Sequence, residues 1–211
     1  MIFKLYIMNK YNLSLFILLF SNNVLAFNTS IHSPEETVKL LQAGGYIIYF
    51  RHGATIHSQQ DNDFSDLENC DYQRNLSEKG KLASTIIGVA INRLNIKIAN
   101  VFTSPFCRTI DTAKLIFNRY KIVFDLRATY ATDSEENQRL NAALKRFLST
   151  IPEQGKNTVI VGHTTNLRAI TKIRTRPEGA AHIFKPLGNN KYIHIGKITP
   201  KQWATLANIQ E

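Results

Sequence analysis

The sequence predicts a three-layer α/β sandwich, with a mostly parallel central sheet and helices on both faces. Four short apolar runs, at 46–50, 99–103, 122–125 and 158–162, have the composition of strands that are buried on both faces. Amphipathic helical patterns alternate with these runs, which favours one sheet covered by helices. No repeat, low-complexity tract or Gly/Ser linker divides the chain, so we expect one domain.

Local signals mark where the helices begin. Ser33 is suited to cap a helix that starts at Pro34 and runs to about Gln42, with Glu36 closing a capping box and Gly44 ending the helix. The other expected elements are a helix capped by Ser77 that runs to about Arg93, helices after 104–105, 133–136 and 163, strands at 181–185 and 192–198 joined by a turn at 188–190, and a terminal helix capped by Thr199.

The first 26 residues have the pattern of a secretory signal peptide. Lys4 and Lys10 precede an apolar core at 13–20, and small residues lead up to Ala26. The core is too short to span a bilayer, which takes about 20 residues. We expect a catalytic domain at 27–211 that is periplasmic or secreted, without stable membrane insertion; the alternative is an uncleaved N-terminal anchor.

The charge balance favours anionic partners. The whole chain carries a formal charge of +10, and without Lys4 and Lys10 it keeps 24 Lys and Arg against 16 Asp and Glu, or +8. The basic residues are scattered, and aromatic residues do not interleave with them as a base-stacking platform requires. A phosphorylated small molecule or glycan is therefore a better match than nucleic acid.

Cationic side chains and imidazoles follow three of the apolar runs. Arg51, His52 and Gly53 end the first run, Arg108 follows the second, and His163 ends the fourth. Because ligands bind at the carboxyl ends of the strands in open α/β sheets, we expect these side chains to meet at one edge. Gly53 is expected to leave room for a ligand or to allow an unusual turn. Arg51 offers a donor fork suited to phosphate.

Three segments in this order, RHGAT at 51–55, SPFCRTIDTA at 104–113 and VGH at 161–163, resemble the signatures of the histidine phosphatase superfamily, the phosphoglycerate-mutase-like enzymes. The resemblance covers nearly the whole chain after residue 26. It implies that His52 attacks phosphorus and becomes phosphohistidine, while Arg51, Arg108 and protonated His163 neutralise the phosphoryl oxygens. Thr55, Arg74 and Thr164 are assigned to phosphate or substrate binding.

The resemblance thus implies a metal-independent phosphomonoester hydrolase that needs no cofactor. Export argues against a mutase, whose glycolytic substrates are absent outside the cytoplasm. The alternatives are a non-catalytic protein that binds a phosphorylated ligand, and a metal site built from His52, His57 and His163. The substrate and the oligomeric state are left open.

The proton donor for the leaving group is ambiguous. Some acid phosphatases have an aspartate directly after the third-signature histidine, where this chain has Thr164. In the mutase-like branch the acid comes from the segment after the third strand, which here offers Asp133, Glu135 and Glu136, with Glu135 preferred. Acids in a first helical turn also favour the helix dipole, which is the structural alternative for each of them.

Two cysteines suggest one disulfide in an oxidising compartment. Cys70 lies shortly before Arg74, and Cys107 directly precedes Arg108. If both segments line one pocket, the two sulfurs are close enough to bond. The alternative is two free, half-buried thiols.

Overall fold

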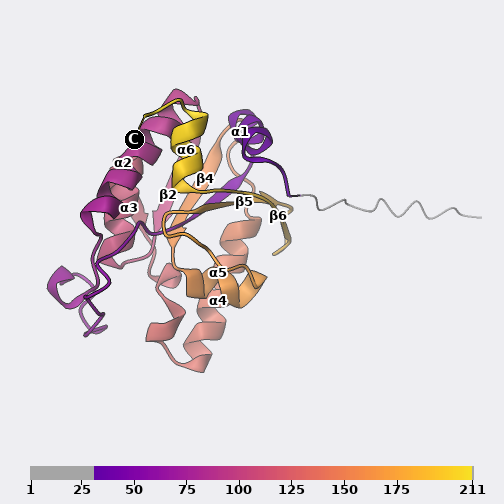
Figure 1. The fold of residues 1–211 in the computed structure, drawn as a ribbon. Helices are drawn as coiled ribbons and strands as arrows, with labels where there is room; N and C mark the ends of the chain where they lie inside the picture. Colours follow the sequence, from indigo (N-terminus) through magenta and orange to yellow (C-terminus); the bar gives the residue numbers. More distant parts are fainter. Residues whose placement is uncertain (1–30, 211) are drawn as a thin grey trace, which may run out of the picture.

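The computed structural model describes residues 31–210, so the predicted signal peptide at 1–26 lies outside the described residues. Six strands form one sheet in the order β3-β2-β4-β1-β5-β6, with the first four parallel and the last two antiparallel (Figure 1). The predicted mostly parallel sheet is confirmed. The strands are β1 (Ile47–Arg51), β2 (Ile98–Thr103), β3 (Lys121–Ile122), β4 (Asn157–Gly162), β5 (Ala181–Pro186) and β6 (Tyr192–Ile198).

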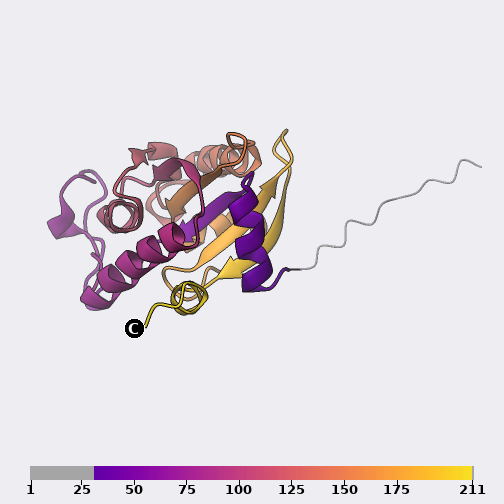
Figure 2. The same cartoon turned by 90° about the horizontal axis from the view of Figure 1, so that it is seen from above.

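The helices form a layer on each face of this sheet, as predicted (Figures 1 and 2). The first layer holds α1 (Pro34–Ala43), α2 (Glu78–Arg93), α3 (Cys107–Phe117) and α6 (Pro200–Leu206), whereas α4 (Ser134–Ser149) and α5 (Thr164–Thr171) cover the opposite face. Within residues 31–210 no helix combines the length and the apolarity that a membrane crossing requires.

Strand β1 shows why there are two cores. Because successive side chains of a strand point to opposite faces, Ile48 and Phe50 enter the first core, while Ile47 and Tyr49 enter the second. Phe50 stacks on Trp203 of α6, with ring centroids 6.3 Å apart. A large apolar side chain fully buried in this way contributes about 1.5–3 kcal/mol. The strand that carries Arg51 is thus held from both sides.

The helix-start predictions are confirmed. The Ser33 hydroxyl accepts from the Glu36 amide while the Glu36 carboxylate accepts from the Ser33 amide, which is the predicted capping box. Ser77 and Thr199 cap α2 and α6 through their hydroxyls. α2 ends at Arg93 as expected.

The predicted strand at 122–125 is wrong beyond Ile122. After β3 the chain leaves the sheet, and Phe124–Leu126 forms a 3-10 turn, with the Leu126 amide donating to the Val123 carbonyl. β3 is an edge strand, and Phe124 is 60 % exposed, so no second layer covers this run as the prediction required. The apolar composition matched a buried strand, but composition alone does not show whether anything packs over it.

A disulfide joins Cys70, in the long loop after β1, to Cys107 at the start of α3, so the second alternative of free thiols does not hold here. Gln73 adds a polar tie between the same two segments, because its side-chain oxygen accepts from the Cys107 amide at 3.0 Å. The loop that precedes α2 is therefore fixed to the turn that carries Arg108.

Loss of this disulfide is expected to destabilise the fold. The bridge closes a loop of 37 residues, for which the chain-entropy relation gives about 3–4 kcal/mol. Urea unfolding of the Cys70→Ser, Cys107→Ser double variant should show a free energy of unfolding lower by that amount than the oxidised wild type. Reduced wild type is the matched control and should unfold like the double variant. Equal unfolding midpoints in all three samples would contradict the prediction.

A buried histidine pair makes the stability depend on pH. His182 on β5 and His194 on β6 lie with ring nitrogens 3.1 Å apart, and burial together with the neighbouring His194 lowers the pKa of His182 to about 4. The unfolded chain binds this proton near pH 6.5, so the contribution is complete above pH 6.5 and is lost as pH falls towards 4. At pH 5 we expect a loss of about 2 kcal/mol from this group.

Urea unfolding of wild type and His182→Gln at pH 7.5 and pH 5 measures this effect. The difference in unfolding free energy between the two pH values should be smaller in the variant, since one buried histidine no longer titrates. An identical pH dependence in the two proteins would contradict the assignment to His182.

Candidate active site

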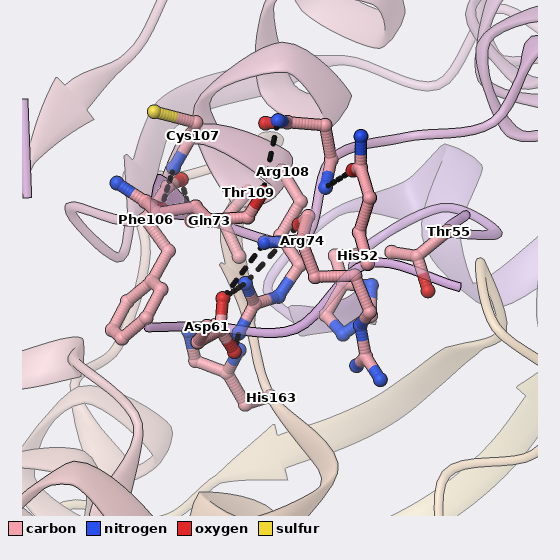
Figure 3. A network of polar contacts seen from close by, with 12 residues as sticks. His52, Thr55, Asp61, Gln73, Arg74, Phe106, Cys107, Arg108, Thr109 and His163 are labelled. Carbon is pink, nitrogen blue, oxygen red and sulfur yellow. Dashed lines mark hydrogen bonds and ion pairs between the residues drawn. The ribbon is translucent and has the colours of Figure 1, made fainter. Parts of the chain in front are cut away.

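The described site lies at the carboxyl ends of β1, β2 and β4, where the sequence placed it (Figure 3). His52 directly follows β1 and is 3 % exposed. Its Nδ1 lies 2.9 Å from the Gly53 carbonyl, which can only accept, so Nδ1 carries the proton and the lone pair is on Nε2. Burial, and next the charge of Arg108, lower the pKa of His52 well below its usual value. The imidazole is therefore neutral and able to act as a nucleophile.

Gly53 has a different role from the predicted one. Its φ is not positive, and a Cβ placed there would lie 2.9 Å from the Ser84 hydroxyl and 3.1 Å from the Gly80 carbonyl of α2. The glycine therefore lets α2 pack against the turn after β1, rather than leaving room for a ligand. The Gly53 amide donates to Thr112 of α3, which fixes the same turn from a second helix.

His163 is held through its backbone by a phenol from the neighbouring strand. The Tyr49 hydroxyl donates to the His163 carbonyl and accepts from the His163 amide, at 2.9 and 3.0 Å. Gly162 makes this contact possible, because any Cβ there would collide with the Tyr49 hydroxyl. The ring Nε2 of His163 lies 2.8 Å from the Ser104 hydroxyl.

The two imidazoles face one another, with ring centroids 5.6 Å apart. Burial and the charge of Arg108 lower the pKa of His163 well below its usual value. His163 is thus neutral in the unliganded protein, which differs from the expected protonated form. Protonation of this ring requires an anion in the site that offsets the surrounding cations.

Arg108, in the first turn of α3, is fully buried and lies 4.6 Å from the centroid of the Phe106 ring. Its guanidinium forms a bidentate pair with Asp61, at 2.8 and 3.2 Å (Figure 3). The Tyr130 hydroxyl accepts from Arg108 and donates to Asp61, each at 2.6 Å, and the Arg74 amide donates to Asp61 at 3.0 Å. A carboxylate of the protein therefore occupies one side of the predicted phosphate-binding arginine.

Arg51 is oriented by Glu178, which lies in the turn between α5 and β5. One Arg51 nitrogen donates to the Glu178 carboxylate at 2.8 Å and another donates to the Thr175 carbonyl. Thr55 also binds Glu178, through both its amide and its hydroxyl at 3.2 Å. This carboxylate therefore holds Arg51 and Thr55 together, and the phosphate contact of Thr55 stays a prediction.

Four buried nitrogen atoms of this site have no hydrogen-bond partner among residues 31–210: the Nε atoms of Arg51, Arg74 and Arg108, and Nδ1 of His163. Buried polar groups are nearly always paired, and the three arginine Nε atoms are donors, so this cluster of unpaired nitrogen atoms needs a physical reason. The charges of all three arginines act on both histidines, which places them around one point. Such a set of donors is suited to a compact, highly charged anion.

The remaining predicted residues make no direct contact with the unpaired nitrogen atoms, although Thr164 directly follows His163. Asp133 caps α4, and Glu136 pairs with Arg127 and Arg139. Glu135 is exposed, and no hydrogen bond or ion pair within the described chain joins its side chain to the arginines or histidines of the site. The Thr164 hydroxyl accepts from the Thr175 amide. A donor or binding role for Glu135 and Thr164 stays a prediction.

A cavity of about 490 Å³ opens beside Asp61 and reaches from there to solvent. It is lined by His57, Gln59, Gln60, Asp61, Phe64, Arg74 and Tyr130. A larger cavity of about 760 Å³ lies across Phe64, which lines both. His57 is exposed at the rim, and within residues 31–210 no group of three or more His, Cys, Asp or Glu side chains is placed to hold a metal ion.

Comparisons with known proteins bear on the fold. No protein-family model and no curated protein sequence matches the chain. Among solved structures, the protein histidine phosphatase SixA complexed with tungstate superposes with a TM-score of 0.51 and 14 % identity, covering 74 % of this chain and 97 % of SixA. The chain has the histidine-phosphatase fold.

A second solved structure with this fold is a phosphoserine phosphatase variant from Entamoeba histolytica in complex with phosphoserine. It superposes with a TM-score of 0.50 and 12 % identity, over 74 % of this chain and 98 % of that chain. Identities this low establish the architecture only. The resemblance seen in the sequence is thus confirmed at the level of the fold, and the chemistry depends on the site itself.

Sequence reasoning missed Asp61, Tyr130 and Glu178, which contact the arginines. Asp61 lies in a polar stretch with several other acids, and Tyr130 lies just before the acids at 133–136. Neither residue ends a strand or starts a helix, so no periodic pattern marks it. Glu178, in the run Arg-Pro-Glu-Gly, has only a turn signal beside it.

Proposed function

We propose that the protein is a phosphomonoester hydrolase that acts through a phosphohistidine on His52. The observation that carries the proposal is the buried cluster of unpaired N–H donors around a neutral imidazole whose Nε2 is free to attack. A phosphoryl group satisfies these donors and gives the nucleophile an electrophile. The histidine-phosphatase fold supports this chemistry, as do the phosphatases SixA and the phosphoserine phosphatase that share the fold.

The reaction follows from the geometry in two steps. Nε2 of His52 attacks phosphorus in line, the bond from phosphorus to the leaving oxygen breaks, and a phosphohistidine forms. Water then attacks phosphorus, the P–N bond breaks, and orthophosphate leaves with the imidazole restored. The Gly53 carbonyl stabilises the imidazole while it carries the phosphoryl group, since it holds the proton on Nδ1.

Arg51, Arg74 and Arg108 supply positive charge where the transition state carries its negative charge. The bound dianion also raises the pKa of His163, whose protonated ring then adds a further donor. Glu178 keeps Arg51 in place without neutralising the other two arginines. In this scheme the protein's own cations neutralise the phosphoryl group, so the proposed reaction uses neither a metal nor a cofactor.

The proposed substrate is a phosphorylated small molecule or a glycan-borne phosphate. The signal-peptide pattern at 1–26 supports a catalytic domain at 27–211 that works in the periplasm or outside the cell. The formal charge of +8 after that segment favours an anionic substrate in either place. A panel of phosphosugars, nucleotides, lipopolysaccharide core phosphates and phosphopeptides would identify the substrate class.

Purified residues 27–211 should hydrolyse para-nitrophenyl phosphate with and without EDTA. Rapid acid-free quenching with labelled substrate should trap a base-stable, acid-labile phosphoramidate on the protein. Binding of orthophosphate without hydrolysis of any phosphate in the panel would favour the alternative, a non-catalytic protein for a phosphorylated ligand. Activity that EDTA removes would instead indicate a metal site.

A further inference from the structure

The Asp61 carboxylate binds Arg108 as a phosphoryl group would, because its two oxygens accept from two guanidinium nitrogens. Arg108 is the most buried cation of the site, with 1 % of its side chain exposed. A phosphoryl group that binds Arg108 through the same nitrogens must displace Asp61.

We propose that Asp61 is the acid that protonates the leaving oxygen once substrate has taken its place on Arg108. This inference rests on the proposed function and assigns the proton donor that the hydrolysis needs. Within residues 31–210, Asp61 and Glu178 are the only carboxyl groups that contact the arginines of the site. Asp61 lines the solvent-facing cavity, whereas Glu178 lines none of the cavities described above.

The electrostatics of the displacement favour this role. In the unliganded protein partial burial opposes ionisation of Asp61, but hydrogen bonds from Tyr130 and the Arg74 amide, together with Arg108, outweigh it and lower the pKa. When a phosphate dianion replaces Asp61 on Arg108, Asp61 loses its contact with the guanidinium. The Asp61 carboxyl group also gains an anionic neighbour. Both changes raise the pKa of the carboxyl group, against the hydrogen bonds from Tyr130 and the Arg74 amide. In this proposal Asp61 takes up a proton from solvent as substrate binds, and releases it after the products leave.

Asp61 also lies beside Tyr130 and a cavity in which the proposal places the leaving group. The Tyr130 phenol, whose pKa burial raises to about 12, stays protonated and keeps a hydrogen bond to Asp61 at 2.6 Å. Asp61 therefore lies between Arg108 and the cavity of about 490 Å³. The leaving group, which points away from His52 in an in-line attack, would extend towards this cavity.

The proton balance closes over one turnover. As the bond from phosphorus to the leaving oxygen breaks, the Asp61 carboxyl proton moves to that oxygen and the alcohol departs. In the second step the Asp61 carboxylate accepts a proton from the water that attacks phosphohistidine. Asp61 ends protonated, His52 ends neutral, and the products are an alcohol and orthophosphate.

The test is the leaving-group dependence of phosphohistidine formation, measured by rapid quench with para-nitrophenyl, phenyl and ethyl phosphate. Asp61→Asn should slow the reaction of ethyl phosphate by about 10²–10⁴-fold, the usual contribution of a general acid. The para-nitrophenyl ester, whose leaving group needs no proton, should lose little. Asp71→Asn is the matched control on the same loop, because Asp71 is exposed and its carboxylate accepts no hydrogen bond within the described residues.

Two further measurements separate the roles of Asp61. Asp61→Asn should bind orthophosphate several-fold more tightly, since the internal competitor loses its charge, and Asp61→Glu should recover part of the ethyl phosphate rate. If Asp61→Asn slows all three esters equally and weakens orthophosphate binding, Asp61 only positions Arg108 and the proposal is wrong. If the rate of phosphohistidine formation depends steeply on the leaving group in Glu135→Gln but not in Asp61→Asn, the proton donor is Glu135.

The same measurements separate a failure of the acid role of Asp61 from a failure of the proposed hydrolase function. A wild-type chain that forms no phosphohistidine from any of the three esters overturns the proposed function and the acid with it. A wild-type chain that forms phosphohistidine, together with an Asp61→Asn variant whose leaving-group dependence is unchanged, overturns the acid alone.

Discussion

His52→Ala is expected to abolish turnover, with a loss of several orders of magnitude, because no other group in the described site offers a lone pair at the same position. The imidazole is neutral, its tautomer is fixed by the Gly53 carbonyl, and it lies among three arginines. Without the His52 imidazole no phosphohistidine intermediate can form. Hydrolysis of para-nitrophenyl phosphate and trapping of labelled phosphoramidate both measure this loss.

Two controls support the interpretation of this variant. His32→Ala, whose ring lies beside Glu36 at the start of α1 and away from the site, should keep the phosphoramidate signal. His52→Ala should still bind orthophosphate, since the arginines remain, and this shows that the site is folded. Appreciable phosphatase activity in His52→Ala would contradict the nucleophile assignment.

Arg108→Ala is expected to lower the rate by about 10²–10³-fold, because one donor of an oxyanion site contributes roughly 3–4 kcal/mol. The variant also leaves Asp61 without its cation, and this costs stability in addition to activity. Arg108→Lys keeps the charge but cannot form the bidentate contact, so its rate should fall between wild type and Arg108→Ala.

The stability effect of Arg108→Ala can be isolated. Adding Asp61→Asn to Arg108→Ala removes the unpaired carboxylate and should restore part of the unfolding free energy without restoring the rate. Arg146→Ala, on the exposed last turn of α4, controls for the loss of an arginine. A rate within a few-fold of wild type in Arg108→Ala would exclude Arg108 from the reaction.

The residues that the sequence predicts well are those set by local pattern. Arg51 ends an apolar strand, and His52, Arg108 and His163 come after one. Parallel strands bring their carboxyl ends to one edge, so this placement needs no knowledge of the loops. The helix caps are also predicted well, because a capping residue and its backbone partner lie within four residues of each other. The third strand was wrong because an edge strand and a buried strand have similar short apolar sequences.

The contacts that the sequence did not predict join segments far apart along the chain. Asp61 meets Arg108 across 47 residues, and Tyr130 meets Asp61 across 69. Neither loop has a periodic pattern, so nothing local indicates which of its acids turns inward. The role of Gly53 was misread for a related reason, since the close approach of α2 depends on the packing of the whole layer.

The disulfide changes how often Asp61 and Arg108 encounter each other when the loop opens. Along the chain the two residues are 47 apart, but across the bridge they are separated by nine residues from Asp61 to Cys70 and one from Cys107 to Arg108. This shorter path lowers the entropy cost of closing the loop by about 1.4 kcal/mol. The effective concentration of the carboxylate at the arginine is thus about tenfold higher in the oxidised protein. Reduction would therefore expose Arg108 more often to phosphate, linking the redox state of the surroundings to the affinity of the site.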